Sequence, residues 1–537
     1  MKSQNSNRTI PIIIGVTGHR TIREEDKPAI YESVKTELKR LREKYPDSQF
    51  VMLSRLAEGG DLLCADISEE LNMPLLAALP VLPEEYEKEF SPAAKVRLTH
   101  HLNRADDVFA VPWTEPAPDT AANRDYLFRQ AGIYVVTHCH ILLALWDGSP
   151  GTKDAGETAE AVDFALHGSY YPSFGMSMRT ESNTGVIHVF TPSADYCDEA
   201  AGTVHLPGNR EAIADILKKT NEFNQQVRES QMPVNSRIPE QAVDDPKLSR
   251  MESVSLIAGK ISFMYAKRYR RVLALLAASS MILTFAFLMY DEMQAIWMIL
   301  VCGIMLIGAW LCQRYASKSD CHQRYIEYRA LAECLRVQVY LRYAGTKIEA
   351  AQLLSWTQQE ETAWIMTALC SLTAGSPAKC RHDIRGCWVE DQRKYHENAK
   401  ERSLKDIRIS ENVVNAALIV SIILYLAAVL FELVCGGLVF TPAIHVENVE
   451  FYRTGLKILL GTISAVTLFI ANYYGRLSLP RTFSDHQKME RFYSKMSDQL
   501  AKRGQTKELL TVLAREELVE NGNWCSYQRD NKPDMSI

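Results

Sequence analysis

The chain has 537 residues, which allows two to four domains. Its 60 basic and 65 acidic residues give a net charge of −5, and this balance excludes a strongly basic nucleic-acid-binding protein. The mean hydropathy of −0.15 is that of a soluble protein, because long polar segments dilute four short apolar blocks. We therefore expect a soluble part and a membrane part in one chain.

The amino-terminal sequence indicates a cytosolic soluble part. The first ten residues, MKSQNSNRTI, are polar, and the apolar PIIIGV that follows is too short for the core of a secretory signal. The 12 cysteines form no CxxC pair and no regular framework. Scattered cysteines in a chain without a signal favour reduced thiols.

Short apolar strands alternate with helical patterns from residue 12 to residue 190. The predicted strands are Ile12–Val16, Gln49–Leu53, Leu75–Leu79, Asp107–Val111, His140–Trp146 and Val186–Phe190. The predicted helices between them are Lys27–Lys44, Asp61–Leu71, Ala93–Arg104, Arg124–His138 and Glu157–Leu166. This alternation is typical of an α/β domain whose parallel sheet is covered on both faces. Ligands of such sheets bind beyond the carboxyl ends of the strands.

Three of the predicted strands end in glycine-containing loops that suit a phosphate-bearing ligand. Glycine allows tight turns and close backbone approach, an arginine pairs with phosphate, and a helix N-terminus attracts anions. The loops are GVTGHR, the segment around EGGD, and the segment from WDG to GET. The candidate ligand-binding residues in them are Gly15, Thr17, Gly18, His19, Arg20, Gly59, Gly60, Asp61, Asp147, Gly148, Gly156, Glu157 and Thr158.

Each loop also has a purely structural explanation. The glycines would then serve only turns, and Asp61 and Thr158 would be only helix-end residues. Three such loops at successive strand ends favour a ligand site over this explanation. Arg124 is a further candidate at the start of a long helix, where either Asn123 caps the helix or Arg124 points to the ligand.

The segment Thr137-His138-Cys139-His140 has the residue types of a metal site. It lies at a helix-to-strand transition, where adjacent side chains diverge, and the sequence shows no second ligand cluster. We therefore expect neither a metal site nor a cofactor.

Residues 192–250 are polar and rich in turns, and they predict a linker. One helix near Asn209–Asn224 is expected to pack back on the α/β domain. We expect residues 230–248 to be mobile and to mark a domain boundary.

Two pairs of membrane-length apolar segments follow. Val272–Tyr290 and Ala295–Cys312 form the first predicted helical hairpin, and Val413–Phe431 and Ile458–Tyr474 form the second. Basic residues flank the outer ends of each pair, whereas the short loop of the first hairpin has none, so both ends of each hairpin are expected on the cytoplasmic side. Glu432 ends the third segment, where it would either line a pore mouth or lie at the membrane interface.

The two hairpins have the character of an internal repeat. The first is followed by His322-Gln323-Arg324 and a helical pattern, and the second by His486-Gln487-Lys488 and another. These helices after the hairpins are expected to be amphipathic, cytosolic and self-associating.

The amino-terminal motifs resemble the SLOG superfamily, a Rossmann-like group of nucleotide sensors and cytokinin-activating phosphoribohydrolases. The likeness covers residues 10–192 and rests on GVTGHR, LAEGGDLLCAD, NRDYLFRQAGIYVVTHCHILLALWDG and GETAEAVDFA. It implies a pocket for a nucleotide-derived ligand. Many members have Gly-Gly-Thr where this chain has Gly156-Glu157-Thr158, and the hydrolase signature PGGxGTxxE is absent, which disfavours an enzyme.

The carboxy-terminal half resembles the SLATT superfamily, whose members combine two membrane helices with cytosolic helices. The likeness covers residues 255–527 in two copies and rests on YRALAECLRVQVYLR, QQEETAWIMTAL, CWVEDQRKYHENA and LAREELVENGNW. It implies a pore-forming or membrane-disrupting effector of bacterial conflict systems that a nucleotide signal triggers.

The expected domains are a nucleotide-sensing α/β domain at 1–195, a linker at 196–254, and membrane hairpins with cytosolic helices at 255–350 and 351–537. The expected function is an antiphage effector of the bacterial inner membrane with both termini in the cytoplasm. Its expected partners are a nucleotide signal, the lipid bilayer and further copies of the chain, with no nucleic acid. The alternatives are a membrane-anchored nucleotide N-glycosidic hydrolase using Asp61 or Glu157, and a ligand-gated ion channel.

Overall fold

The computed structural model describes residues 8–111, 122–149, 158–168, 184–193, 196–230, 245–355, 361–379, 381–434, 448–476 and 479–530, with the isolated positions 233, 236–238 and 358. The chain forms two compact units. The first unit consists of Met1–Gly259, Glu327–Ile384 and Gln505–Trp524, and the second of Lys260–Ile326, Arg385–Gly504 and Cys525–Ile537.

A seven-stranded sheet forms the centre of the first unit within the described residues. Its strands are β1 (Ile12–Gly18), β2 (Phe50–Ser54), β3 (Leu75–Leu79), β4 (Asp107–Ala110), β5 (Ile141–Trp146), β6 (Gly185–Phe190) and β7 (Val204–His205). They lie in the order β4-β3-β2-β1-β5-β6-β7, and every neighbouring pair except β6–β7 is parallel. The predicted α/β class with a parallel sheet is confirmed. The antiparallel strand β7 was not predicted, because a strand of two residues shows no sequence pattern.

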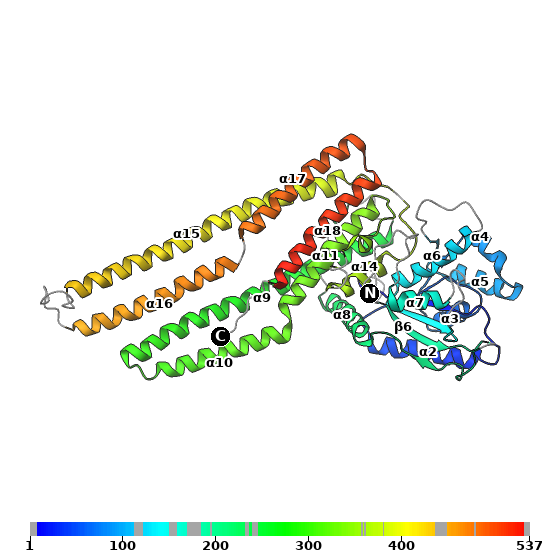
Figure 1. Ribbon diagram of the computed structural model, residues 1–537, viewed down its shortest axis with the longest axis horizontal. Coiled ribbons are helices and arrows are strands. Elements are labelled where there is room, and N and C mark those ends of the chain that lie inside the picture. The colour runs from blue at the N-terminus through cyan, green and yellow to red at the C-terminus, as the bar shows by residue number, and fades with distance from the viewer. Residues whose placement is uncertain are drawn as a thin grey trace. The chain divides into compact units, whose positions relative to one another are not determined.

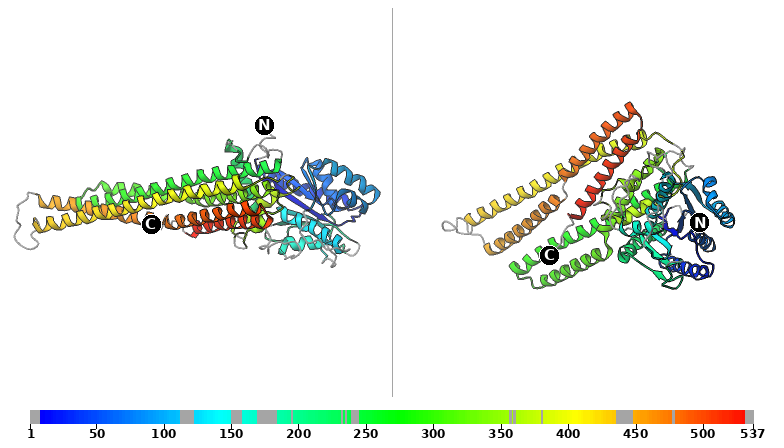
Figure 2. Two further views of the ribbon diagram at one scale, coloured as in Figure 1. Left: turned by 90° about the horizontal axis from the view of Figure 1, so that it is seen from above. Right: turned by 45° about the vertical axis from the view of Figure 1, so that its right-hand side comes forward.

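Helices cover both faces of the sheet, as Figures 1 and 2 show. One face packs against α2 (Lys27–Lys44), α3 (Gly60–Glu70), α5 (Pro92–Arg104) and α8 (Arg210–Ser230). The other packs against α6 (Ala122–His138) and α7 (Thr158–His167). Strand side chains alternate between these layers, so that Ile12 and Ile14 enter one core and Ile13 the other. The short α4 (Pro83–Tyr86) and the 3-10 helix η1 (Glu87–Glu89) connect β3 to α5.

The predicted linker helix packs on the sheet domain. It is α8, and its Asn224 side chain both accepts from the Ile10 amide and donates to the Ile10 carbonyl, each at 2.8 Å. Much of the segment expected to be mobile, at 230–248, lies outside the described residues.

The first unit also contains helical segments from later in the chain. They belong to α9 (Pro246–Met293), α11 (Cys321–Tyr343), α12 (Ala350–Leu353), α14 (Ala363–Thr373) and α18 (Lys507–Asp530). Helix α14 is apolar on all sides and almost entirely buried, which is typical of a central core helix. Its Trp364 donates to Glu327 of α11 at 3.0 Å.

The second unit contains the membrane-length helices. In the described part of the chain, four helices are long and apolar enough to cross a membrane: α9, α10 (Met298–Ser319), α15 (Asp391–Val434) and α16 (Val449–Arg476). The most apolar stretch of α15 has a mean hydropathy of 2.7 and none of it is buried. Such exposed apolar helices need lipid or another apolar partner. The four predicted spans lie in helices that are long and apolar enough to cross a membrane, except that α10 begins three residues later than its predicted span, because Ile296 and Trp297 form the turn after α9.

Each hairpin consists of a long helix and a shorter antiparallel one (Figure 1). At the outer end of the second hairpin, Arg453 of α16 binds both carboxylate oxygens of Glu432, at 2.7 and 2.9 Å. Glu432 is therefore a paired residue in this structure. After the second hairpin, α17 (Leu479–Arg503) returns along α15, and Lys400 of α15 pairs with Glu490 of α17 at 2.5 Å.

Candidate nucleotide site

The candidate site lies where the strand order reverses. Strands β2, β3 and β4 follow β1 in one direction across the sheet, whereas β5 and β6 lie on its other side. The loops that leave β1 and β5 therefore diverge, and such a switch point is where open α/β sheets bind ligands. The His19 amide donates to the Leu145 carbonyl at 3.0 Å, so the two loops begin side by side.

The candidate residues His19 and Asp147 meet at this point. His19 Nε2 lies 3.1 Å from the Asp147 amide nitrogen and 3.3 Å from Asp147 Oδ1. The Asp147 carboxylate accepts from the amide and hydroxyl of Ser149 and so closes its own turn, in which Gly148 has a φ of +80°. Burial alone would raise the pKa of Asp147, but hydrogen bonds from Ser193 and Ser149 and the proximity of His19 lower it to about 2. Asp147 is therefore ionised and organises the loop.

Three predicted glycines bring two loops into backbone contact. A Cβ on Gly18 would lie 3.1 Å from the Gly60 Cα, and one on Gly60 would lie 3.0 Å from the Gly18 Cα. Gly59 has a φ of +93°, and a Cβ there would lie 2.2 Å from the His19 carbonyl oxygen. The end of β1 and the start of α3 can approach this closely only because these positions lack side chains.

The amides at the start of α3 are largely used within the protein. The Gly60 amide donates to the His19 carbonyl at 2.9 Å, and the Leu62 amide donates to Ala57 at 3.3 Å. The expectation that the amides of this turn receive an anion therefore does not hold for Gly60, whose hydrogen is committed to the neighbouring loop.

Asp61 faces the interior of the domain. Its side chain is fully buried and accepts from the Ser54 hydroxyl at 3.0 Å. Burial raises the pKa of Asp61, although the charge of Arg55 and the Ser54 hydrogen bond oppose this effect. In this arrangement Asp61 organises the loop after β2, and it would have to move to contact a ligand.

Arg55 connects Asp61 to the end of β1. Its side chain is buried, and Nη2 donates to Thr17 Oγ1 at 3.2 Å. Thr17 in turn lies 3.5 Å from the hydroxyl of Thr158, the first residue of α7. The structure thus brings Thr17 and Thr158 together as predicted, whereas Gly156 and Glu157 lie outside the described residues.

Two predicted arginines converge on one carboxylate. Arg20 follows β1 and Arg124 lies in the first turn of α6, and both bind Glu89 of η1. Arg20 Nη2 lies 3.4 Å from one Glu89 oxygen, and Arg124 contacts the other. The arginine side chains are 61% and 54% exposed, so solvent and a ligand reach them while Glu89 holds them together.

Gly15 lies apart from this group. It is in the middle of β1, where a Cβ would come within 2.7 Å of Cys139 Sγ, so it allows α6 to pack against the strand. The adjacent histidines of the rejected metal motif diverge: His138 contacts Glu349 at 3.0 Å, and His140 Nδ1 accepts from the Ile13 amide at 3.1 Å.

Sequence reasoning missed Arg55 and Glu89. Arg55 directly follows β2 and precedes EGGD, so a basic residue at a strand end gave a usable signal. Glu89 lies in a run of charged residues and gave none. A separate cavity of about 320 Å³ is lined by the first residues of β5 and β6 with α2 and α8, at the opposite ends of the strands. No protein-family model matches the chain, and no curated protein matches it in sequence.

Proposed function

We propose that this chain is a membrane effector of a bacterial conflict system that a nucleotide-derived signal activates. The observation that carries the proposal is the joining, in one chain, of an arginine-flanked strand-end site to four membrane-length helices. The SLOG-like and SLATT-like motifs support the same assignment. The signal would bind the α/β domain, and the helices would then open a pore in the inner membrane or disrupt it.

The arginine pair supports a phosphate-bearing ligand. Guanidinium groups bind phosphate oxygens through paired, charge-assisted hydrogen bonds. Glu89 places one carboxylate between Arg20 and Arg124, where a phosphate group would make equivalent contacts. We infer that the ligand displaces Glu89 from the arginines and so releases η1 from the start of α6.

The membrane half supports insertion with both hairpin ends in the cytoplasm. Lys267, Arg268, Arg270 and Arg271 precede the first span, and Arg314 and Lys318 follow the second. These bases lie at the same end of the antiparallel hairpin, opposite the short loop at Gln294, and basic residues favour the cytoplasmic side. On this basis we propose that the chain lies in the bacterial inner membrane with both termini in the cytoplasm.

Contacts inside the first unit offer a route from the sheet to the first membrane helix. Asp107 of β4 binds Lys247 in the first turn of α9, and it also accepts from the Ser376 amide at 2.7 Å. Burial would raise the pKa of Asp107, but these two hydrogen bonds lower it, so the carboxylate is ionised. Since α9 continues without a break into the first span, a shift of β4 would act on that helix directly.

A membrane effector of this kind would act as a homo-oligomer. A protomer with four apolar spans and few charges within them has little polar surface with which to line a pore. The ligand must bind the active arrangement more tightly than the resting one, since only differential affinity shifts the equilibrium.

The test is dye release from liposomes that contain the purified full-length chain, with cyclic nucleotides, ADP-ribose derivatives and NAD added in turn. We expect one ligand class to cause release and to be recovered unchanged by chromatography. Arg20→Ala should abolish release, whereas the matched control Arg23→Ala should not, because Arg23 pairs with Asp26 in the adjacent turn. Consumption of the ligand would instead identify the hydrolase, and a selective, reversible conductance without dye release would identify a channel.

A further inference from the structure

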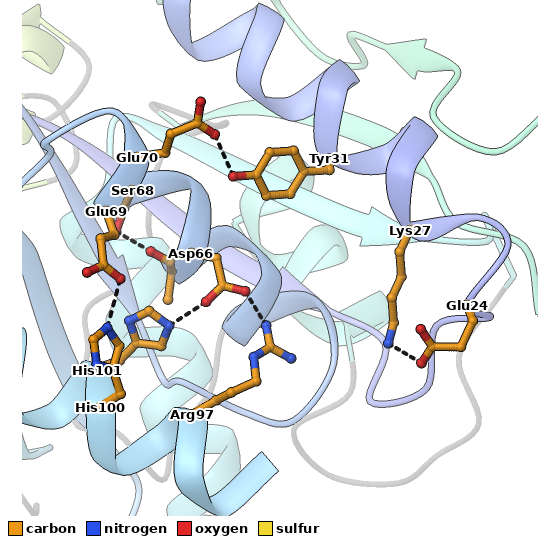
Figure 3. Close-up of polar contacts among 11 residues, drawn as sticks. Glu24, Lys27, Tyr31, Asp66, Ser68, Glu69, Glu70, Arg97, His100 and His101 are labelled. Carbon is orange, nitrogen blue, oxygen red and sulfur yellow. Dashed lines mark hydrogen bonds and ion pairs between the residues drawn. The ribbon is translucent and has the colours of Figure 1, made fainter. Parts of the chain in front are cut away.

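A cluster of histidine and carboxylate side chains joins the far ends of α3 and α5. Glu69 lies in the last turn of α3, and His100 and His101 lie near the carboxyl end of α5. One potential ligand atom from each of these three residues lies within 4.8 Å of the other two. His100 Nε2 is 2.9 Å from Glu69 Oε2, and the centroids of the two imidazole rings are 5.1 Å apart. Figure 3 shows the two histidines beside Glu69.

His101 carries a buried nitrogen without a hydrogen-bond partner. The residue is fully buried, and its Nε2 contacts Asp66 Oδ1 at 2.7 Å. Among the described residues, its Nδ1 has no hydrogen-bond partner. Figure 3 shows this second nitrogen on the side of the ring that faces His100 and Glu69. Buried polar atoms in native structures normally have a partner, so this atom requires an explanation.

Asp66 fixes the state in which His101 can bind a metal. A carboxylate accepts a hydrogen bond from the nitrogen it contacts, so Asp66 keeps the ring proton on Nε2 and leaves a lone pair on Nδ1. A metal-binding histidine characteristically donates its other nitrogen to a carboxylate in this way. Arg97 binds the second oxygen of Asp66 and holds the carboxylate in place.

The position of the cluster also favours a cation. The carbonyl ends of two helices meet there, and the negative end of a helix dipole attracts positive charge. Glu69 and His100 are 44% and 58% exposed, so water can complete the coordination. Two imidazoles and a carboxylate with an open position form a donor set that suits Zn²⁺. Tetrahedral zinc with ligands at about 2 Å needs donor atoms about 3.3 Å apart. The three candidate donor atoms here lie within 4.8 Å of one another.

We propose that Glu69, His100 and His101 form a zinc-binding site in which Asp66 is the positioning residue. This inference goes beyond the proposed function and does not depend on it. Sequence spacing does not indicate the site, because the third ligand comes from a different helix. The ion would clamp the carboxyl end of α3 to that of α5. At the amino ends of the same helices, Gly60 belongs to the candidate nucleotide site and Ser91 binds Glu58 at 2.6 Å. A bound zinc ion would therefore fix α3 against α5, and α3 begins at the loop that contributes Gly60 to the candidate nucleotide site.

The test is metal binding to the full-length chain in detergent after chelator treatment, with Zn²⁺ followed by calorimetry and Co²⁺ as a spectroscopic probe. We expect one saturable zinc ion per chain and a cobalt spectrum without intense thiolate bands. His100→Ala and Glu69→Gln should each weaken binding at least about 10-fold, and Asp66→Asn about 10- to 100-fold. The matched control is His167→Ala, since His167 forms an exposed carboxylate pair with Asp163 and has no third ligand group among the described residues.

Both replaced ligands are exposed, so these variants should fold and isolate the effect on the metal. The proposal is overturned if zinc does not bind at one equivalent, if cobalt shows thiolate coordination, or if His100→Ala and Glu69→Gln bind as tightly as His167→Ala. Because the readout is metal binding, a failure of nucleotide sensing would leave this result unaffected.

Discussion

Removing the charge of Glu89 should strengthen ligand binding if its carboxylate occupies the place of a phosphate. The change is Glu89→Gln, which keeps the side-chain size and removes the anion that Arg20 and Arg124 share. Each exposed ion pair of this kind is worth about 0.2–1 kcal/mol, so the two together are worth about 0.4–2 kcal/mol. Since a tenfold change in affinity corresponds to about 1.4 kcal/mol, the affinity should rise about 2- to 30-fold.

The assay is titration of the full-length protein with the nucleotide that binds in the panel, at low and at high salt. The gain should shrink at high salt, because screening weakens the exposed pairs that the ligand displaces. Glu58→Gln is a suitable control, since Glu58 lies nearby but hydrogen-bonds to Ser91 and not to the arginines. Weaker binding by Glu89→Gln would refute the reasoning, because Glu89 would then be needed to position the arginines and would not compete with the ligand.

Three further predictions follow from single residues. Gly59→Ala should lower the melting temperature and ligand affinity more than Gly148→Ala, because its Cβ would lie 2.2 Å from a backbone oxygen, whereas the nearest contact at Gly148 is at 4.0 Å. Burial lowers the pKa of His140 to about 3, so this histidine should destabilise the fold by about 2 kcal/mol at pH 5 relative to pH 8, where it is neutral in both states. In the unmodified chain, the amides of β1 and β5 should therefore be less protected from hydrogen exchange at pH 5 than at pH 8. His140→Asn should not show this difference. Lys247→Met should leave ligand affinity unchanged and reduce ligand-triggered dye release, and equal release would exclude this contact from the coupling.

Hydrophobic periodicity predicted the elements of the α/β domain well. Leu75–Leu79 and Lys27–Lys44 have the predicted bounds, and the remaining predicted strands and helices of this domain differ from theirs by at most two residues at either end. The central strands β1 and β2 are buried on both faces, so each is a continuous apolar run that ends where polar loop residues begin. β7 was not predicted because two residues carry no periodicity, and it pairs with β6 only through the connection after Phe190.

Backbone features of the site were easier to predict than its side-chain partners. Two loops can approach this closely only where the facing positions lack a Cβ. Glycine at positions 18, 59 and 60 therefore indicates the contact in the sequence itself. The direction of the Asp61 side chain could not be predicted in this way. The rotation of α3 about its axis decides whether Asp61 faces solvent or the core. Packing of α3 against the sheet turns Asp61 inward, toward Ser54 and Arg55, and no local pattern states that choice.

The same partners explain which ligands the site should prefer. Each arginine of the site already has a carboxylate or hydroxyl partner: Arg20 and Arg124 share Glu89, and Arg55 binds Thr17 near Asp61. Ligand binding at the exposed pair is therefore an exchange in which an anion replaces a carboxylate of one charge. A phosphate monoester or a pyrophosphate carries more charge and more acceptor oxygens than Glu89, so it gains from the exchange, whereas a ligand with a single carboxylate does not. We therefore expect selectivity for multiply charged phosphate ligands. Glu89→Gln removes the same displacement cost for every ligand, so it should raise the affinity for phosphates and for carboxylates alike and leave their ratio unchanged.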